Sequence, residues 1–273
     1  MTAMAIGAKI GQGMSAEVYD CGGGKVLKLY RDWMSREAIR YEARIGRAVA
    51  AAGAPCAAVL GEIEHDGRLG LLFERVPGCS MLVGLQRQPW RAARFGRELA
   101  QLHHRIHAHR TAELPDQRQH FLRSIQLSAK PLGDRMDRVL AVLDDLPAGH
   151  SVCHGDFHPD NVITDGTRSV PIDWTNAFFG HPAADVVRTG LMLRSPYMPP
   201  GLPAWMHRIS GWIKGRMLDA YMGEYRRLSG MTRRELEQFV LPVAAARLHE
   251  NIPGEREWLL DLVDDALTRD EAA

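Results

Sequence analysis

The sequence predicts an α+β protein with two lobes, a β-rich N-terminal lobe with one main helix and a larger, mainly helical C-terminal lobe. Short β-prone segments separated by glycine-rich turns fill the chain before "ERVPG", which is typical of a small antiparallel sheet. After that point apolar residues recur mainly at helical spacing, with one short hairpin between the helices. We therefore expect residues 1–76 to form the first lobe and residues 77–273 the second.

The first lobe should contain short strands and a single helix. Glycine-rich "GQGMSAEVY" lies between β-prone pieces, and "GGGK" predicts a tight turn before the strand "VLKLY". Apolar residues at steps of three and four predict a helix over residues 35–52. Strands are expected over residues 57–64 and 69–73, joined by Asp66 and Gly67, because an Asp-Gly pair is a strong hairpin signal.

The second lobe should be built from helices around one small hairpin. Helical periodicity is found over residues 95–106, 121–127, 136–146, 204–227 and most of 232–268. The hairpin is expected to pair residues 161–164 with residues 170–174 through another Asp-Gly turn. On the helix over residues 204–227, Trp212 and Tyr221 are expected to lie in the core.

Composition and charge exclude several classes of protein. The chain is 45% hydrophobic and 25% charged, as soluble globular proteins are. Its net charge of +1 does not indicate a basic surface that would bind nucleic acid. Its four cysteines are scattered without a Cys-x-x-Cys pair, which argues against a zinc ribbon or a disulfide scaffold. The N-terminus has no signal-peptide pattern, and no apolar run is long enough to cross a membrane. We expect a cytoplasmic monomer or weak dimer that binds neither nucleic acid nor membranes.

The segment "VCHGDFHPDNVI" concentrates chemically active side chains between two strand-like pieces. His154, Asp156 and His158 would share one face of an extended chain, and imidazole and carboxylate ligands suit zinc, so a metal-dependent hydrolase is one interpretation. Against it, Asn161 is a poor zinc ligand, and no second cluster rich in histidine or cysteine completes the coordination.

A phosphoryl-transfer loop accounts for more of these residues. Such a loop needs a carboxylate that accepts the proton of the attacking hydroxyl, an amide oxygen for Mg²⁺ five residues later, and a metal-binding carboxylate after the following hairpin. Asp156 and Asn161 have this spacing, and Asp173 in "PIDW" falls at the expected end of the second hairpin strand. Few, hard oxygen ligands of this kind suit Mg²⁺ shared with nucleotide phosphates.

A glycine-rich turn near the N-terminus could hold those phosphates. In "IGQGMSAEVY", Gly11 and Gly13 lack side chains, so that backbone N–H groups could approach phosphate, and Ser15 lies in the same turn. An ordinary hairpin would look similar, and Ala16 stands where a third glycine would strengthen the signal.

A lysine and a glutamate complete the set in the N-terminal lobe. Lys28 in "VLKLY" is flanked by apolar strand residues and has a better register than Lys25 to reach the phosphates. Glu42 and Glu37 on the following helix are its two candidate partners, and we favour Glu42.

Together these motifs resemble the aminoglycoside phosphotransferase family, which is related to choline, homoserine and macrolide kinases. "HGDFHPDN", "PIDW" and the later "GHPAADV" carry the resemblance. It implies a bilobal protein-kinase-like fold, with a nucleotide-binding lobe over residues 1–76 and a catalytic and substrate-binding lobe over residues 77–273. "LLFERVPG" resembles the hinge, where the carbonyl of Glu74 and the N–H of Val76 would hold the purine edge.

The resemblance also assigns supporting residues. His103 in "LAQLHH" is expected to support the catalytic loop, Asp185 to hydrogen-bond it, and His154 to brace it rather than act as a base. One residue departs from the protein-kinase pattern, because Trp174 follows Asp173 where protein kinases have Phe-Gly. The bulky indole predicts a fixed loop and a constitutively competent enzyme.

The sequence thus predicts a small-molecule O-phosphotransferase. With Mg²⁺ it would transfer the γ-phosphate of ATP or GTP to a hydroxyl of an antibiotic or related natural product, and so confer antibiotic resistance. The alternatives are a metabolic kinase for a sugar, amino alcohol or nucleoside, and a non-catalytic pseudokinase. Acidic and basic residues nearly balance over residues 180–270, where the acceptor pocket is expected, which favours a neutral or weakly charged acceptor over a polycation.

Overall fold

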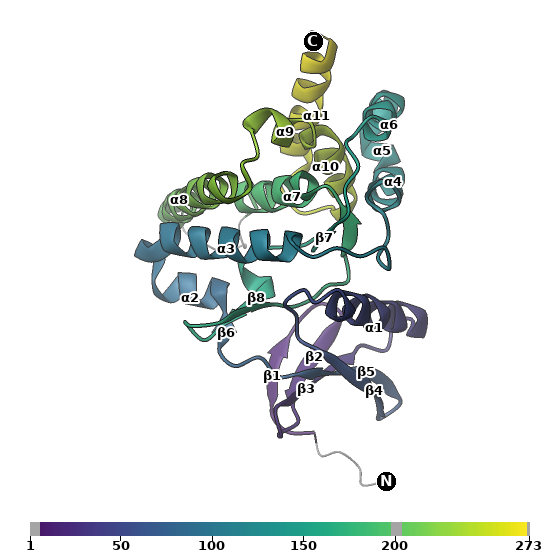
Figure 1. Cartoon of the computed structure of the whole chain (residues 1–273), viewed down its shortest axis with the longest axis vertical. Coiled ribbons are helices and arrows are strands. Elements are labelled where there is room, and N and C mark those ends of the chain that lie inside the picture. The colour runs from purple at the N-terminus through teal and green to yellow at the C-terminus, as the bar shows by residue number, and fades with distance from the viewer. Residues whose placement is uncertain (1–5, 198–203, 272–273) are drawn as a thin grey trace.

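The structure is a computed structural model that describes residues 6–197 and 204–271. It has a sheet-based N-terminal lobe below a larger helical lobe (Figure 1), which confirms the predicted α+β class. The chain passes from one lobe to the other after Glu74, at the end of the sheet. Within the described residues, no helix is both long and apolar enough to span a bilayer.

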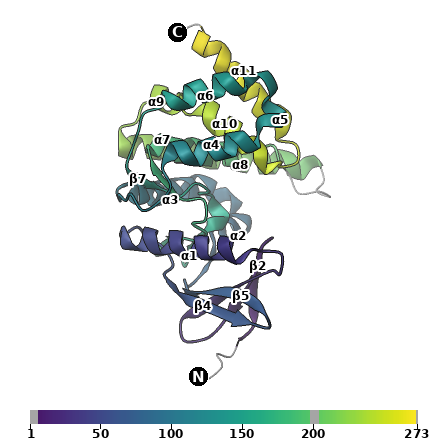
Figure 2. The same cartoon turned by 90° about the vertical axis from the view of Figure 1, so that its right-hand side faces the viewer.

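The N-terminal lobe is a five-stranded antiparallel sheet in the order β1-β2-β3-β5-β4. Its strands are β1 (Lys9–Gln12), β2 (Ala16–Asp20), β3 (Lys25–Tyr30), β4 (Val59–His65) and β5 (Arg68–Glu74). One helix, α1 (Arg36–Ala51), packs on the sheet through Ile39 and Ala43 (Figure 2). It begins at Ser35, whose side chain accepts a hydrogen bond from the Ala38 N–H, as a good N-cap does.

The C-terminal lobe consists mainly of helices. They are α2 (Met81–Arg87), α3 (Ala92–His107), α4 (Gln117–Leu127), α5 (Ala129–Leu132), α6 (Met136–Asp144), α7 (Pro182–Arg194), α8 (Ala204–Ser229), α9 (Arg233–Glu237), α10 (Val240–Arg247) and α11 (Arg256–Glu271). The long helices α3 and α8 lie side by side (Figure 1), and α7 packs on α8. This layer forms the floor on which the "HGDFHPDN" motif lies, since α3 and α7 both contact the strand that precedes it.

Short strands hold that motif in place. β7 (Ser151–Cys153) pairs with β10 (Phe178–Gly180), and β8 (Val162–Thr164) pairs with both β6 (Cys79–Ser80) and β9 (Ser169–Pro171). The strand that follows the link between the lobes is therefore hydrogen-bonded to the strand that follows Asn161.

Several sequence expectations need correction. The second hairpin strand ends at Pro171, not at residue 174, so Asp173 lies in the loop beyond it. Helices α2 and α7 and strand β10 were not predicted; α7 is buried on nearly every side and so lacks an amphipathic pattern. The core position predicted for Trp212 is wrong, because its side chain is 57% exposed and lies against the Arg216 guanidinium, whereas Tyr221 is buried as predicted.

The close crossing of α3 and α8 depends on Gly96. A Cβ at this position would lie 2.3 Å from the carbonyl oxygen of Met217 on α8. We expect Gly96→Ala to lower the free energy of unfolding by about 1–3 kcal/mol through overpacking, as measured by urea denaturation. Gly223→Ala on α8 is the matched control, since nothing lies within 4 Å of its added Cβ. The proposed tight crossing is wrong if both variants are as stable as the wild type.

Candidate active site

The motif His154–Gly155–Asp156 forms a sharp turn directly after β7. Gly155 has φ +76°, and a Cβ there would lie 2.0 Å from the carbonyl oxygen of Asn176. Any side chain would therefore clash with fixed backbone as well as strain the turn. The local fold explains why glycine occupies the middle of the motif.

A buried carboxylate fixes the turn from below. Asp185, near the start of α7, is fully buried. Its Oδ2 accepts a hydrogen bond from the backbone N–H of His154 at 2.5 Å, and its Oδ1 accepts one from the N–H of Gly155 at 3.0 Å. The His154 ring adds a second brace, with Nε2 3.0 Å from the carbonyl oxygen of Ile172. The loop-bracing positions expected for Asp185 and His154 are thus observed.

Two histidines of α3 complete the surroundings of this carboxylate. Nε2 of His103 lies 2.9 Å and Nε2 of His107 3.3 Å from Asp185 Oδ2. Their Nδ1 atoms lie 2.7 Å from the Tyr221 hydroxyl and 2.6 Å from the Tyr225 hydroxyl, respectively. This geometry fits neutral rings that donate from Nε2 and accept at Nδ1. His103 acts on the motif through Asp185, while the role of His107 and the contacts of the two tyrosines with these histidines were not predicted from the sequence.

Burial determines the charges in this cluster. It lowers the pKa of His103 to about 3, and the nearby His107 lowers it further, against the opposing effect of Asp185. Burial also raises the pKa of Asp185, but the histidines around it lower that pKa more strongly, and the carboxylate stays ionised. A single negative charge held by four donors is the stable arrangement.

Asp156 lies in the open part of the turn, with 27% of its side chain exposed. The Asn161 Nδ2 donates to the backbone oxygen of Asp156 at 2.9 Å and to its Oδ2 at 3.1 Å. Burial raises the pKa of Asp156, but the nearby His158 and the charge of Arg188 lower it more, and the net pKa is below its usual value. The carboxylate is therefore ionised and can accept a proton.

Asp173 lies beside Asn161 because the Ile172 N–H donates to the carbonyl oxygen of Asn161 at 2.9 Å. Its φ is +61°, a left-handed conformation that costs a non-glycine residue about 1–2 kcal/mol. Its Oδ1 lies 3.4 Å from the Lys28 Nζ of β3. The structure thus brings Asp156, Asn161 and Asp173 together, with Lys28 reaching them from the other lobe.

Lys28 is held in position by its partner on α1. Its Nζ donates to Glu42 Oε1 at 2.8 Å, so the pairing with Glu42 rather than Glu37 is observed. Burial lowers the pKa of Lys28, but the carboxylates of Asp173 and Glu42 raise it more, and the lysine stays charged. The cation therefore points at the group of carboxylates rather than at solvent.

The glycine-rich turn joins β1 to β2 at the edge of the sheet. The Gly13 N–H donates to the carbonyl oxygen of Ala16 at 2.9 Å, and Ser15 lies within the turn. A Cβ added to Gly11 or Gly13 would meet no atom closer than 3.5 Å. Packing within the chain therefore does not require glycine at either position, which leaves close approach of a ligand as a reason for it.

The expected hinge residues lie where the chain leaves the sheet. Glu74 ends β5, and its N–H donates to the carbonyl oxygen of Ala58 at 2.9 Å. Val76 follows in the irregular link of residues 75–78, before β6. Both residues therefore lie where the chain passes from the sheet to the helical lobe.

The geometry disfavours the zinc-hydrolase interpretation. The His154 ring is buried and hydrogen-bonded to the backbone, so it does not join Asp156 and His158 in an open ligand set. Within the described residues, the group whose ligand atoms do lie close together is His103, His107 and Asp185. All of those ring nitrogens already have hydrogen-bond partners.

By contrast, Asn161 and Asp173 fit Mg²⁺. The Asn161 Nδ2 is occupied by Asp156, which leaves its amide oxygen as a ligand, and the Asp173 carboxylate is 45% exposed. Two hard oxygen donors at an open position suit a Mg²⁺ ion that takes its other ligands from phosphate and water.

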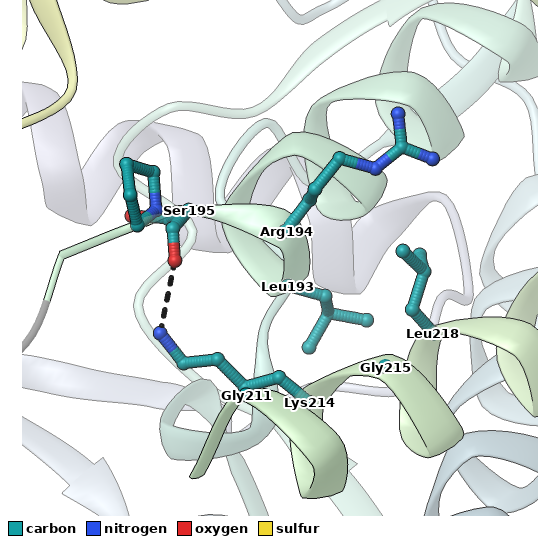
Figure 3. Close-up of a pocket in the computed structure, with 8 residues that line it drawn as sticks. Leu193, Arg194, Ser195, Gly211, Lys214, Gly215 and Leu218 are labelled. Atoms are coloured by element: carbon teal, nitrogen blue, oxygen red, sulfur yellow. Dashed lines mark hydrogen bonds between the residues drawn. The ribbon is translucent and has the colours of Figure 1, made fainter. Parts of the chain in front are cut away.

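A pocket of about 350 Å³ opens between the end of α7 and α8 (Figure 3). Leu193 and Leu218 form its apolar walls, and Gly211 and Gly215 expose the backbone of α8. The Lys214 Nζ donates to the carbonyl oxygen of Ser195 at 3.1 Å. Burial lowers the pKa of Lys214, with Glu255 opposing.

One residue beside Asp156 was missed in the sequence. Arg188 of α7 is buried, and its Nη2 lies 3.4 Å from Asp156 Oδ1. Its position three residues after Asp185, on the same face of a helix, was the available signal, but α7 itself had not been predicted.

Comparison with known proteins identifies the family to which the chain belongs. The model of the phosphotransferase enzyme family matches residues 7–218, more than half of the chain. The chain therefore belongs to this family, and it is a phosphotransferase of the kinase type. A search of curated proteins found no match.

Solved structures show the same fold. A thermostable mutant of aminoglycoside phosphotransferase APH(4)-Ia has 17% identity and a TM-score of 0.59, over 97% of this chain and 92% of that one. A type VIII aminoglycoside-3'-phosphotransferase has 20% identity and a TM-score of 0.60, over 90% and 92% of the two chains. APH(3'')-Id from Streptomyces rimosus has 18% identity and a TM-score of 0.55, over 85% of this chain and 89% of that one. The resemblance noted in the sequence is confirmed at the level of the fold.

The buried histidine predicts how stability depends on pH. An unfolded histidine has a pKa of about 6.5, whereas that of His103 is about 3 in the folded protein. Between these values the unfolded chain binds a proton that the folded chain does not, so stability is full above pH 6.5 and falls as the pH is lowered. We expect His103→Gln, which can still donate to Asp185, to reduce this slope by up to about 1.4 kcal/mol per pH unit.

The measurement is urea unfolding between neutral and mildly acidic pH. His65→Gln serves as the control, because the His65 side chain is 41% exposed. Identical pH slopes in the wild type and His103→Gln would show that the ring does not titrate as described.

Proposed function

We propose that the protein transfers the γ-phosphoryl group of ATP or GTP, with Mg²⁺, to a hydroxyl of a small molecule, and that this acceptor is an antibiotic or related natural product. The observation that carries the proposal is the convergence of Asp156, Asn161, Asp173 and the Lys28–Glu42 pair at the junction of the lobes. Phosphoryl transfer requires groups of these kinds. The family to which the chain belongs consists of phosphotransferases, which supports the same reaction.

Asp156 is assigned to the acceptor hydroxyl. Its carboxylate is ionised and accepts the hydrogen bond of the hydroxyl, which orients the oxygen toward the γ-phosphorus and receives its proton during transfer. Asn161 holds one oxygen of this carboxylate, so that the hydroxyl is directed to a fixed place. A pseudokinase, the alternative without chemistry, is disfavoured because the base and the metal-binding groups are present together.

Asn161 and Asp173 are assigned to Mg²⁺, which when bound neutralises charge on the phosphates. Lys28 would leave its ion pair with Asp173 to contact phosphate oxygens while Glu42 keeps it aligned. Gly11, Gly13 and Ser15 would supply backbone N–H groups above the phosphates. The carbonyl of Glu74 and the N–H of Val76 would hold the purine edge.

Similar structures agree with these two ligands. A ternary complex of APH(4)-Ia contains AMP-PNP and hygromycin B, and a second contains ADP and hygromycin B. In the present chain, by analogy, a nucleoside triphosphate would bind between the two lobes, and the acceptor would lie against the C-terminal lobe. We propose a role in antibiotic resistance on this basis.

The charges near Asp156 indicate the kind of acceptor. Glu250 lies 2.6 Å from the Arg188 Nη1, and Glu255 receives two hydrogen bonds from Arg247. An ammonium group that binds in the site loses water and needs a carboxylate in its place. These two carboxylates are already paired with guanidinium groups and are not free to serve an ammonium group of the acceptor. A neutral or weakly charged acceptor therefore fits better than a polycation.

Removal of the proposed base and metal ligand tests the mechanism. We expect Asp156→Asn to lower kcat by about 10²–10⁴-fold while nucleotide still binds. Asp173→Ala should abolish turnover even at high Mg²⁺, and Lys28→Ala should weaken nucleotide use. Steady-state kinetics with calorimetry of Mg²⁺–nucleotide binding provide the readout. Wild-type turnover in Asp156→Asn, or unchanged Mg²⁺ affinity in Asp173→Ala, would refute the corresponding assignment.

A panel of hydroxylated compounds tests the acceptor. We expect neutral or weakly charged natural products to show higher kcat/KM than kanamycin-like polycations, with ATP and GTP each supplied as donor. Ionic strength is held fixed and then raised, because salt screens the attraction on which a polycation depends. A preference for polycations that fades with added salt would contradict the charge argument. Preference for a sugar, amino alcohol or nucleoside would instead identify a metabolic kinase.

A further inference from the structure

Arg188 makes three contacts that converge on the catalytic turn. Its Nε donates to the carbonyl oxygen of Gly155, its Nη2 lies 3.4 Å from Asp156 Oδ1, and its Nη1 lies 2.6 Å from Glu250 Oε1. Only 9% of the Arg188 side chain is exposed. A buried guanidinium with every nitrogen engaged has one orientation, because its donors form a rigid fork.

The guanidinium completes the support of Asp156 on the side that Asn161 does not reach. Asn161 holds Oδ2, whereas Arg188 approaches Oδ1, so the two carboxylate oxygens have different partners. The next residue of α7 adds to this support, since the Thr189 hydroxyl donates to the carbonyl oxygen of Phe157 at 2.8 Å. Helix α7 thus holds both the backbone of the turn and the carboxylate itself.

A chain of alternating charges anchors Arg188 from behind. Glu250, in the 3-10 turn that follows α10, also accepts a hydrogen bond from the Arg247 Nη1 at 2.9 Å, and Arg247 pairs with Glu255 at 2.8 Å. The Ser195 hydroxyl, at the end of α7, donates to Glu255. This chain ties the end of α7 and the turn after α10 to the guanidinium of Arg188, which lies beside Asp156.

We propose that Arg188 is the positioning residue of the phosphoryl-transfer reaction, which sets the orientation of the Asp156 carboxylate toward the acceptor oxygen. The proposal rests on the assignment of Asp156 to the acceptor. Arg188 does not itself contact nucleotide or acceptor, so its loss changes where the carboxylate points and not whether nucleotide binds. A misplacement of about 1 Å in such a group costs on the order of 100-fold in rate.

The test uses hydrolysis of MgATP with water as the acceptor, which requires no knowledge of the natural acceptor. We expect Arg188→Ala to lower kcat by about 10- to 100-fold, while the KM for MgATP stays within about twofold of the wild-type value. Millimolar guanidinium, compared with sodium chloride at equal ionic strength, should restore part of the lost kcat by occupying the vacated site. Arg188→Lys should be intermediate, because an ammonium group keeps the charge but not the fork.

Arg247→Ala is the matched control. Arg247 is equally buried and pairs with the same Glu250, but it makes no contact with Asp156. Both variants should lose thermal stability, but Arg247→Ala keeps the Arg188 guanidinium beside Asp156, so it should lose less kcat than Arg188→Ala and should not recover with guanidinium. Unchanged kcat in folded Arg188→Ala, or an equal loss in both variants without rescue, would overturn the proposal.

Asp156→Asn, measured in parallel, separates this proposal from the proposed function. A loss in Asp156→Asn without a loss in Arg188→Ala refutes the role of Arg188 alone. Wild-type hydrolysis in Asp156→Asn refutes the assignment of Asp156 to the acceptor, and the role of Arg188 with it.

Discussion

The buried carboxylate of Asp185 is the interaction on which the catalytic turn depends. A charge in the interior is costly unless donors surround it, and here two backbone N–H groups and two imidazoles do so. The same bonds that stabilise the charge fix the backbone of His154 and Gly155. The same hydrogen bonds therefore serve both the stability of the helical core and the geometry of the site. A change that displaces α3 or α7 also displaces the turn that carries Asp156.

Much of the site could be read from the sequence because its parts are close together along the chain. The spacing of Asp156 and Asn161 is set by one turn and one short helix, and it does not depend on the rest of the fold. The Lys28–Glu42 pair could be predicted for a similar reason, since a strand and the next helix along the chain place the two residues on facing surfaces.

The parts that were missed depend on contacts between distant segments. Arg188 meets Asp156 across 32 positions, and His107 meets Asp185 across 78. Helix α7 supplies both Arg188 and Asp185, but its even burial removes the periodicity by which a helix is recognised. The hairpin strand was drawn too long because strand-like residues continue to Trp174, whereas the left-handed backbone of Asp173 ends the regular pairing earlier. Trp212 was misplaced because an aromatic residue on a helix carries no information about which face is covered.

The pairing of β6 with β8 has a mechanical consequence for the two lobes. Gly78, which precedes β6, lies so close to the backbone of Thr164 that a Cβ there would fall 2.1 Å from its carbonyl oxygen, and β6 is hydrogen-bonded to β8, so this end of the link is tied to the hairpin of β8 and β9. Any rotation of the sheet relative to the helices must then be absorbed by the backbone between Glu74 and Gly78. Pro77 restricts one of the few torsions available there. The link is short and its torsions are restricted, so a rotation of one lobe relative to the other pivots at residues 74–78 and displaces atoms far from this link more than atoms beside it.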